Sequence, residues 1–416
     1  MISARIAAIL IGLGIFGLIS STVFNLLVFA GAYRFAMARR KRRKLALTDF
    51  HPPVSLLKPL HGDEPNLDAH IASFFEQDYP NFEILFCARY ASDAGLQTAR
   101  RVAARYPAVP AKFLLTGEPA YINAKASSLE KMAAVAASDI FIISDSDVRV
   151  TPNYIRDVVA PFADERVGAV TCLYRGVADE GPWAKLEAAG MSIEMTSGVL
   201  AANMMEGMQF TLGPTMAVRR GCVDEMGGFG YLGPYCADDF VLGNQVTARG
   251  HEVVLSDHVI DHIVLNLSFN ASVKHQVRWM KSTRFSRPKG HFGTSLTFAV
   301  PFGLLAGFAA WYLHRPYLAL ALIAYSIMAR MAMAAVVGKV VVEERHLLRT
   351  ILLYPLRDLL GFFYWAASYA SSKILWRGRV YRLTEGGLMQ PVQLKSGQLI
   401  ERPADKSVSQ EPVSGR

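Results

Sequence analysis

Two short acidic clusters are the residues of this chain best suited to chemistry, and the first is Asp145-Ser146-Asp147. It follows directly on the apolar run IFIIS, so two carboxylates one residue apart stand at the end of an expected strand. Carboxylate oxygens suit Mg²⁺ or Mn²⁺, and a partly hydrated ion of this kind can bridge a diphosphate and offset the charge of a departing nucleotide. Acidic pairs are also common in turns, so a purely structural role stays open.

The second cluster is Asp238-Asp239, in the sequence GPYCADDFVLGNQ. One of its carboxylates could simply cap the helix that the following residues predict. The functional interpretation is that one of them removes the proton from an attacking hydroxyl. A displacement with inversion needs one such base, on the face opposite to the leaving group.

A third element is the sequence HQVRW at residues 275–279. Here Arg278 could hold a diphosphate, and Trp279 could form a wall of an acceptor pocket. Equally, the segment could be a basic helix near a membrane, with its tryptophan at the interface.

The domain that carries these residues is preceded by an apolar segment. The chain has 416 residues, is 52% hydrophobic and has a formal net charge of +9. Residues 6–33 carry no charge, and they exceed the roughly 20 residues that span a bilayer. The basic run RRKRRK at 39–44 follows, and the positive-inside rule makes this flank cytoplasmic. We predict an uncleaved anchor at 1–33 and a basic linker at 34–53.

The positive charge of the chain is concentrated beside its hydrophobic segments, which indicates an anionic membrane surface. Because the sequence has no recognition module that combines aromatic and basic residues, we do not expect it to bind nucleic acid.

Residues 54–295 have the composition of a globular domain. Short apolar runs typical of strands occur at 54–60, 82–88, 111–116, 139–145 and 167–174. Patterns typical of helices occur between them at 67–75, 96–106 and 127–137. This alternation predicts an α/β fold with a mainly parallel sheet covered on both faces. Ligands bind beyond the carboxyl ends of such strands, where Asp145 and Asp147 stand.

Residues 296–376 are membrane-like again. Two spans are predicted at 296–313 and 317–337, with a tight His-Arg-Pro turn between them. The second span contains Arg330, which must face protein or reach the interface.

A third hydrophobic stretch, residues 347–376, is interrupted by Arg357 and Asp358. It could be a span with a polar break or an interfacial helix, and the topology of this last element stays open. Residues 377–416 are expected to form a polar, partly disordered tail.

Taken together, these motifs resemble those of ceramide glucosyltransferases, which are lipid glycosyltransferases with a GT-A fold. The resemblance rests on VSLLKPLHGDEPNL at 54–67, FFEQDYPNFEILFCA at 74–88 and RWMK at 278–281. It covers most of the chain, with the anchor and the C-terminal hydrophobic segments in the expected places. It implies a GT-A-like domain with an N-terminal transmembrane helix and C-terminal transmembrane or interfacial helices.

The pattern of this family consists of three acidic sites and a (Q/R)xxRW element. By the resemblance, Asp145 is the second acidic site and Asp147 completes a D-x-D motif that holds the metal. Asp239 is the third site and the expected catalytic base. Arg278 and Trp279 form the RW element, and the resemblance implies that both are catalytic residues.

The resemblance also assigns residues to the donor. In YINAKASSL, Asn123 and Lys125 match a donor-binding stretch in which the lysine faces phosphate. Two positions depart from the pattern. Tyr90 stands where the first acidic site usually has an aspartate, which leaves Asp93 as the candidate for the nucleotide contact. His275 stands at the first position of (Q/R)xxRW, where it can still donate a hydrogen bond.

Two further groups have weaker signals. Residues 191–208 are rich in methionine and could form an adaptable surface for a lipid chain, or an ordinary core helix. His251, His258 and His262 lack the spacing of metal ligands, so we expect them to be structural.

The resemblance implies that the chain transfers glucose from UDP-glucose to the primary hydroxyl of ceramide, with inversion, and with Mg²⁺ or Mn²⁺ as cofactor. The product would be β-glucosylceramide. The expected location is a cell inner membrane, as a multi-pass protein whose catalytic domain faces the cytoplasm. No obligate protein partner is evident. Alternatives are transfer of another sugar, such as N-acetylglucosamine, to a hopanoid or other lipid, and an inactive membrane scaffold or lipid-binding protein.

Overall fold

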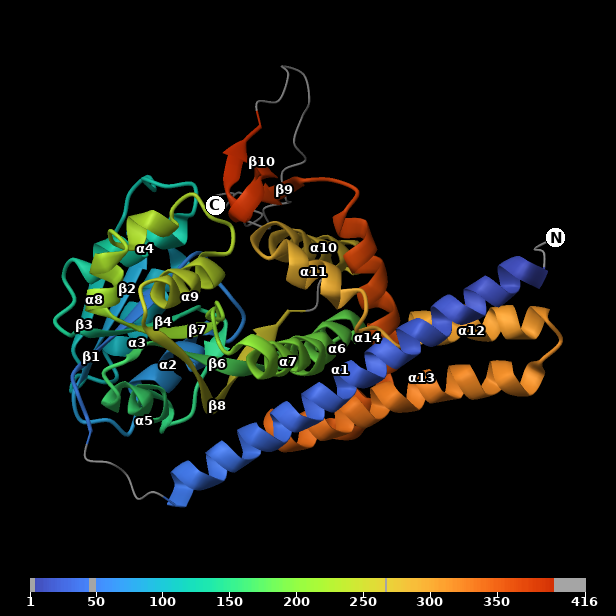
Figure 1. Ribbon diagram of the computed structural model, residues 1–416. Coiled ribbons are helices and arrows are strands. Elements are labelled where there is room, and N and C mark those ends of the chain that lie inside the picture. The colour runs from blue at the N-terminus through green and yellow to red at the C-terminus, as the bar shows by residue number, and fades with distance from the viewer. Residues whose placement is uncertain (1–3, 45–49, 266–267, 393–416) are drawn as a thin grey trace, which may run out of the picture.

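A computed structural model describes residues 4–44, 50–265 and 268–392 of the chain (Figure 1). It consists of an α/β body and an arm of helices that extends away from it. The two parts meet along a layer of helices that includes α6, α7 and α14.

The body is built on an eight-stranded sheet with the order β3-β2-β1-β4-β7-β6-β8-β5. Its strands are β1 (Val54–Pro59), β2 (Phe82–Ala88), β3 (Ala111–Leu115), β4 (Ile140–Ser144), β5 (Val148–Arg149), β6 (Val167–Ala178), β7 (Thr215–Arg219) and β8 (Glu252–Val264). Strands β3, β2, β1 and β4 run parallel, as do β6 and β8, whereas β7 and β5 are antiparallel to their neighbours. The α/β prediction with a mainly parallel sheet is therefore confirmed, and every predicted strand is present.

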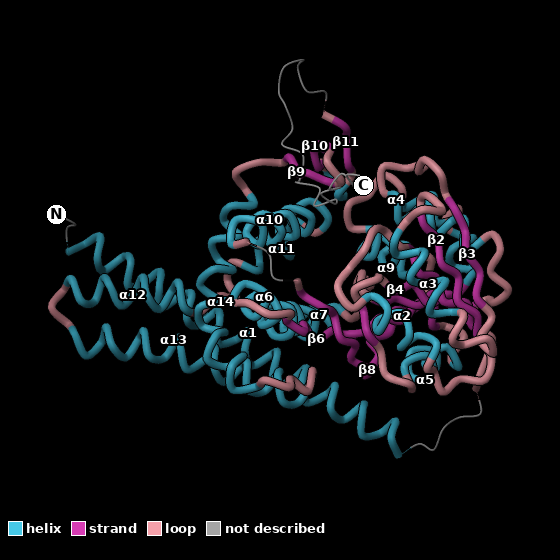
Figure 2. Tube along the Cα trace, turned by 180° about the vertical axis from the view of Figure 1, so that it is seen from behind, coloured by secondary structure: helices cyan, strands magenta, loops and turns pink. Residues whose placement is uncertain are grey.

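Helices cover both faces of this sheet, as the fully buried β4 requires. They are α2 (Leu67–Phe75), α3 (Ala94–Ala103), α4 (Ala124–Ala133), α5 (Tyr154–Val159), α8 (Arg220–Glu225) and α9 (Asp238–Ala248). In both views α4 and α9 lie on one side of the sheet, and α2 and α5 lie on the other (Figure 2).

A continuous helical stretch joins the body to the arm. It consists of α6 (Pro182–Ala189), a π-helical turn η2 (Gly190–Met195) and α7 (Thr196–Glu206). This is the methionine-rich stretch, and most of its side chains are buried, Met191 and Ile193 among them. Its role beside a lipid chain stays a prediction.

The arm contains α1 (Ala4–Lys44), α12 (Val300–Tyr312) and α13 (Pro316–Val336). The three helices lie side by side, with the N-terminus and the α12–α13 turn at the same far end (Figures 1 and 2). Two described helices are long and apolar enough to cross a membrane, Ala4–Lys41 and Pro316–Val341. The predicted span at 296–313 is shorter than expected, because turns occupy its first residues and leave α12 only 13 residues.

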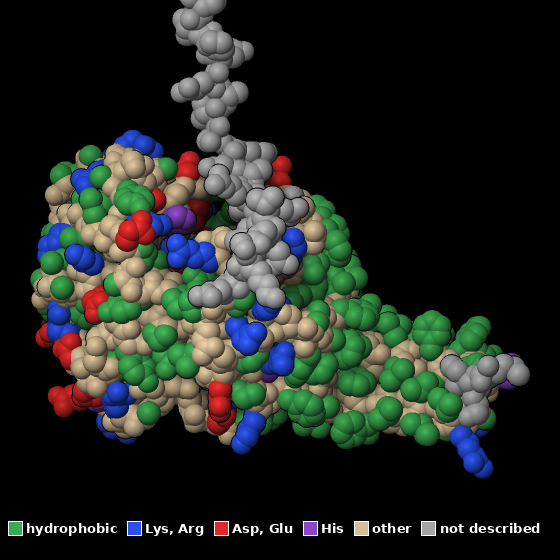
Figure 3. Space-filling model, turned by 90° about the horizontal axis from the view of Figure 1, so that it is seen from above, with side chains coloured by type: hydrophobic (Ala, Val, Ile, Leu, Met, Phe, Trp, Pro, Cys, Tyr) green, Lys and Arg blue, Asp and Glu red, His purple; other side chains and the backbone are tan. Residues whose placement is uncertain are grey.

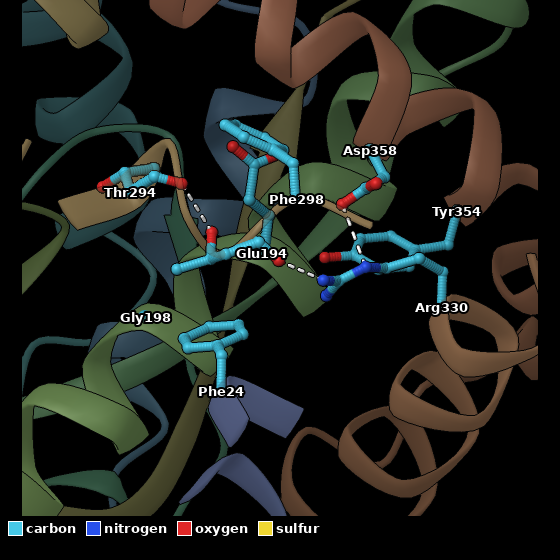
Figure 4. Close-up of a pocket in the computed structure, with 9 residues that line it drawn as sticks. Phe24, Glu194, Gly198, Thr294, Phe298, Arg330, Tyr354 and Asp358 are labelled. Carbon is cyan, nitrogen blue, oxygen red and sulfur yellow. Dashed lines mark hydrogen bonds and ion pairs between the residues drawn. The ribbon is translucent and has the colours of Figure 1, made fainter. Parts of the chain in front are cut away.

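The third hydrophobic stretch forms α14 (Leu347–Ser368), which packs against α10 (Phe269–Ser286) and the short α11 (Pro288–Thr294). The charges that interrupt it point into the protein. Asp358 Oδ1 lies 3.1 Å from Arg330 Nε, beside a cavity of about 70 Å³ (Figure 4). Arg330 therefore faces protein, as required. Arg357 binds Glu194, at 2.9 Å, and donates a hydrogen bond to Gln276 Oε1, at 2.8 Å.

A small antiparallel sheet that the sequence analysis did not predict follows α14. Its strands are β9 (Lys373–Trp376), β10 (Arg379–Leu383) and β11 (Met389–Pro391). Arg377 and Gly378, both with positive φ, make the tight turn between β9 and β10. The expected tail therefore begins with ordered structure, and residues 393–416 lie outside the described part of the chain.

Candidate active site

Two lysines meet the first acidic cluster, one from the end of β1 and one from the start of α4. Lys125, at the start of α4, forms an ion pair with Asp145, with 2.7 Å between Nζ and Oδ1. Lys58, at the end of β1, is fully buried and donates a hydrogen bond to the backbone oxygen of Asp145, at 2.8 Å. Its ammonium group lies 3.6 Å from the centre of the Phe74 ring. Burial lowers the pKa of Lys58 to about 7, although the nearby carboxylates oppose this effect.

Asp147 pairs with a histidine that the sequence analysis expected to be structural. His262 Nε2 lies 3.0 Å from Asp147 Oδ2, because β5 and β8 pair with Val148 opposite His262. Burial opposes charge on both groups, but their mutual attraction and hydrogen bond lower the pKa of Asp147 and raise the pKa of His262. No sequence spacing could indicate this contact, because it depends on the pairing of two strands.

The two carboxylates fit a divalent cation that keeps other ligands. Asp147 Oδ1 is buried and has no hydrogen-bond partner among the described residues, while the Asp145 side chain is 34% exposed. Among the described residues, no group of three or more histidine, cysteine or acidic side chains is arranged to hold a metal ion. Such a set is not required of Mg²⁺, which usually keeps several waters and is bound by one or two carboxylates together with substrate phosphates.

The second acidic cluster lies at the start of α9 and meets the first through Lys125. Asp238 Oδ2 is 3.9 Å from Lys125 Nζ. The Asp239 carboxylate accepts hydrogen bonds from the backbone N–H of Gly213, at 2.7 Å, and of Phe240, at 2.8 Å. Burial, followed by the charge of Asp238, raises the pKa of Asp239 to about 6. A carboxyl group with this pKa is suited to general base catalysis near neutral pH.

The RW element lies on α10. His275 Nδ1 is 2.8 Å from Glu187 Oε1, and the His275 and Trp279 rings are 4.4 Å apart. Arg278 makes no hydrogen bond or ion pair within the described chain, and its guanidinium group lies 4.9 Å from the centre of the Trp376 ring. Burial lowers the pKa of Arg278. The donors of its guanidinium group are therefore available to a ligand.

Two residues predicted to contact the donor form hydrogen bonds that stabilise the local backbone. Asn123 caps α4 by accepting a hydrogen bond from Lys125 N, and its amide donates to Tyr235 O, at 3.2 Å. The Asp93 oxygens accept from Leu96 N, at 3.1 Å, and Gly62 N, at 2.9 Å. Donor contacts by these two residues stay predictions.

At the first acidic site, where Tyr90 replaces the usual aspartate, the carboxylate of Glu118 lies beside Tyr90. Tyr90 donates a hydrogen bond to Glu118 Oε1, at 2.5 Å, and Arg89 forms an ion pair with the same carboxylate. No sequence motif marks Glu118, because it follows β3 and lies beside Tyr90 only through the pairing of β2 with β3.

The other histidines pair with carboxylates outside the site. His251 lies 3.1 Å from Glu225, and His258 lies 2.8 Å from Asp157. Their expected structural role agrees with these contacts, whereas His262 belongs to the site.

The structure thus brings Asp145, Asp147, Lys125 and the Asp238–Asp239 pair together. His275, Arg278 and Trp279 lie on a separate helix, α10. Seen from above, acidic and histidine side chains lie in a hollow of the body, and hydrophobic side chains coat the arm (Figure 3).

Comparison with known proteins gives a family match over most of the chain. The model of Glycosyl transferase family 21 matches residues 19–389. Ceramide glucosyltransferase 3 of Caenorhabditis elegans is 27% identical over 82% of this chain and 74% of its own length. Ceramide glucosyltransferase 1 of the same organism is 27% identical over 63% of this chain, which spans only 56% of that relative. A solved structure, the mannosyltransferase PcManGT from Pyrobaculum calidifontis in complex with GDP-Man and Mn²⁺, has 19% identity and a TM-score of 0.49, over 85% of this chain and 99% of that one.

Proposed function

Since this chain belongs to glycosyl transferase family 21, we propose that it transfers glucose from UDP-glucose to the primary hydroxyl of ceramide, with inversion, to form β-glucosylceramide. The similarity to ceramide glucosyltransferases of C. elegans supports this substrate pair. The observation that carries the proposal is the position of Lys125. Its ammonium group contacts the D-x-D motif at Asp145 and approaches the acidic pair at Asp238.

Asp239 is the base in this proposal. Its pKa of about 6 leaves it mainly ionised at neutral pH, and yet more basic than an exposed aspartate. The N–H of Gly213 fixes its carboxylate, so little reorganisation is needed when the acceptor hydroxyl arrives. The proton of that hydroxyl moves to Asp239 as the oxygen attacks the anomeric carbon.

Lys125 and Arg278 provide positive charge for the donor. Lys125 is held between two acidic groups, which raise its pKa against the effect of burial and keep it charged. Within the part of the chain that the structure describes, the N–H donors of Arg278 are unoccupied, and they suit a diphosphate. A divalent cation held by Asp145 and Asp147 would add positive charge beside the departing diphosphate.

The apolar helices of the arm support a location of this protein in a membrane, which agrees with a lipid acceptor. We propose that α1 and α13 span the bilayer of a cell inner membrane, that α12 carries the chain across it before α13 returns, and that α14 lies at its surface. Because α13 returns the chain to the side where α1 ends, this arrangement keeps the catalytic body on one side, which the basic run after α1 identifies as cytoplasmic. In this division residues 54–295 form the catalytic domain and residues 296–376 form the C-terminal membrane region.

A transfer assay tests the proposal. Purified full-length protein in lipid nanodiscs receives ceramide, Mg²⁺ or Mn²⁺, and labelled UDP-glucose, UDP-galactose or UDP-N-acetylglucosamine, and lipid products are analysed by mass spectrometry. Hexosylceramide formed from UDP-glucose alone is the expected result. A labelled lipid that appears only with total bacterial lipid, or only with another donor, would replace the acceptor or the sugar in the proposal. No turnover of any UDP-sugar, with or without acceptor, would favour the inactive scaffold.

A further inference from the structure

The C-terminal sheet β9–β11 is joined to the loop that leads into the second acidic cluster. Cys236 N donates to Gly387 O, at 3.0 Å, and Met389 N donates to Pro234 O, at 2.8 Å. Between these two hydrogen bonds, Tyr235 and Leu388 form a β-bridge. The loop therefore acts as an additional edge of the small sheet, immediately before α9 begins at Asp238.

The same sheet is also fixed to α10, the helix of the RW element. Lys281 Nζ donates to the backbone oxygen of Lys373, at 2.9 Å. Gly387, with φ of +81°, lies so close to α10 that a Cβ added there would be 2.5 Å from Ser286 Oγ. A separate hydrophobic cluster closes the junction, and it consists of Cys236, Ile374, Tyr381, Leu383 and Met389.

Trp376, the last residue of β9, is the point at which this sheet meets Arg278. The indole ring lies under the guanidinium group, with 4.9 Å from Cζ to the ring centre. Trp376 Nε1 is buried and makes no hydrogen bond within the described residues, and Arg278 lies over the π face of the ring. The Trp376 ring is the interaction partner of the Arg278 guanidinium group. A π face attracts a cation without occupying the N–H donors of that cation.

We propose that the β9–β11 sheet forms a wall of the active site, and that Trp376 is a positioning residue that holds Arg278 in the orientation required by the donor diphosphate. The inference rests on the proposed function, in which Arg278 binds the diphosphate. Without the ring, Arg278 would sample several rotamers before each donor binds, and binding would carry the entropic cost of selecting one. The effect should therefore fall on the donor and act through Arg278.

A double-mutant cycle tests the inference in the full-length protein, with Trp376→Ala, Arg278→Ala and the double variant. Leu375→Ala is the matched control, because Leu375 is the neighbouring residue of β9 and is exposed. UDP affinity is measured by calorimetry, and kcat/KM for UDP-glucose is measured at saturating ceramide. We expect Trp376→Ala to weaken both by about tenfold, which corresponds to about 1.4 kcal/mol, and Leu375→Ala to change neither. In the Arg278→Ala background, Trp376→Ala should cause no further loss.

Losses that add in the double variant, or a Trp376→Ala protein that binds UDP like the unchanged chain, would overturn the inference. Thermal unfolding of each variant checks the fold. If Trp376→Ala unfolds early, the cycle is run with Trp376→Phe, which keeps a ring of weaker π character and should lose less than threefold. An unchanged chain that uses no UDP-sugar would refute the proposed function, whereas the UDP-binding cycle still decides the role of Trp376.

Discussion

Replacing Lys125 with methionine should move the pH dependence of turnover to higher pH. The substitution keeps an unbranched side chain of similar length and removes the ammonium group that lies 2.7 Å from Asp145 and 3.9 Å from Asp238. The positive charge of Lys125 lowers the pKa of the Asp239 carboxyl, and burial and Asp238 raise it. Without Lys125 the N–H groups of Phe240 and Gly213 still lower this pKa, but they alone remain to oppose burial and Asp238.

The size of the effect follows from the geometry. Two charges about 4 Å apart interact by about 4 kcal/mol at an effective dielectric constant of about 20, which bounds the loss at Asp238 from above. Lys125 interacts more weakly with Asp239 than with Asp238. We therefore expect the pKa of Asp239 to rise from about 6 to about 7, a change of about 1.4 kcal/mol. Because Asp239 must be ionised to accept a proton, the shift alone should lower activity about twofold at pH 7, and activity should recover at higher pH.

The assay is kcat as a function of pH, between about pH 5 and pH 9, at saturating donor so that weaker binding does not mask the shift. Lys131→Met is the matched control, because Lys131 lies in the last turn of the same helix α4 and is exposed. Its profile should coincide with that of the unchanged protein. A Lys125→Met profile with the original midpoint, however low its plateau, would refute the coupling between Lys125 and Asp239.

Three other substitutions test the remaining parts of the site. Asp239→Asn should lower kcat by about 10²- to 10⁴-fold and leave UDP binding intact; unchanged turnover would rule out Asp239 as the base. Gly213→Ala places a Cβ 3.1 Å from Asp239 Oδ2, so it should displace that carboxylate and lower kcat by roughly tenfold or more, with KM for the donor little changed. Asp147→Ala should raise the Mn²⁺ or Mg²⁺ concentration for half-maximal activity by about tenfold or more, and an unaltered metal titration would contradict a role in metal binding.

The parts of the site that lie within one βα unit could be predicted from the sequence. Asp145 and Asp147 follow a strand whose first four residues are apolar and buried, and Lys125 lies in the first turn of the helix before that strand. Strand and helix periodicity is a local signal, so their shared position at the edge of the sheet follows from it.

Contacts between distant elements could not be predicted in this way. His262 reaches Asp147 only because β5, a strand of two residues, pairs with β8. Trp376 lies on a strand of four residues, too short for alternation to be distinct, and its packing partners come from α10 and the loop at Cys236. Hydropathy also misplaced the start of α12, because residues that form turns beside buried protein are as apolar as a membrane span.

In the proposed membrane arrangement, the length of α1 fixes how far the α/β body stands from the bilayer. A helix of 41 residues is about 60 Å long, twice the thickness of a hydrocarbon core. Its first part lies along α12 and α13, and its last part is held at Arg39, which donates to the backbone oxygens of Asp257 and Val341. Because α1 is one continuous helix over its described length, it connects the arm rigidly to the body. In that arrangement the proposed lipid acceptor travels to a site held at constant height, and each residue inserted into α1 would raise that site by about 1.5 Å and turn it by about 100°.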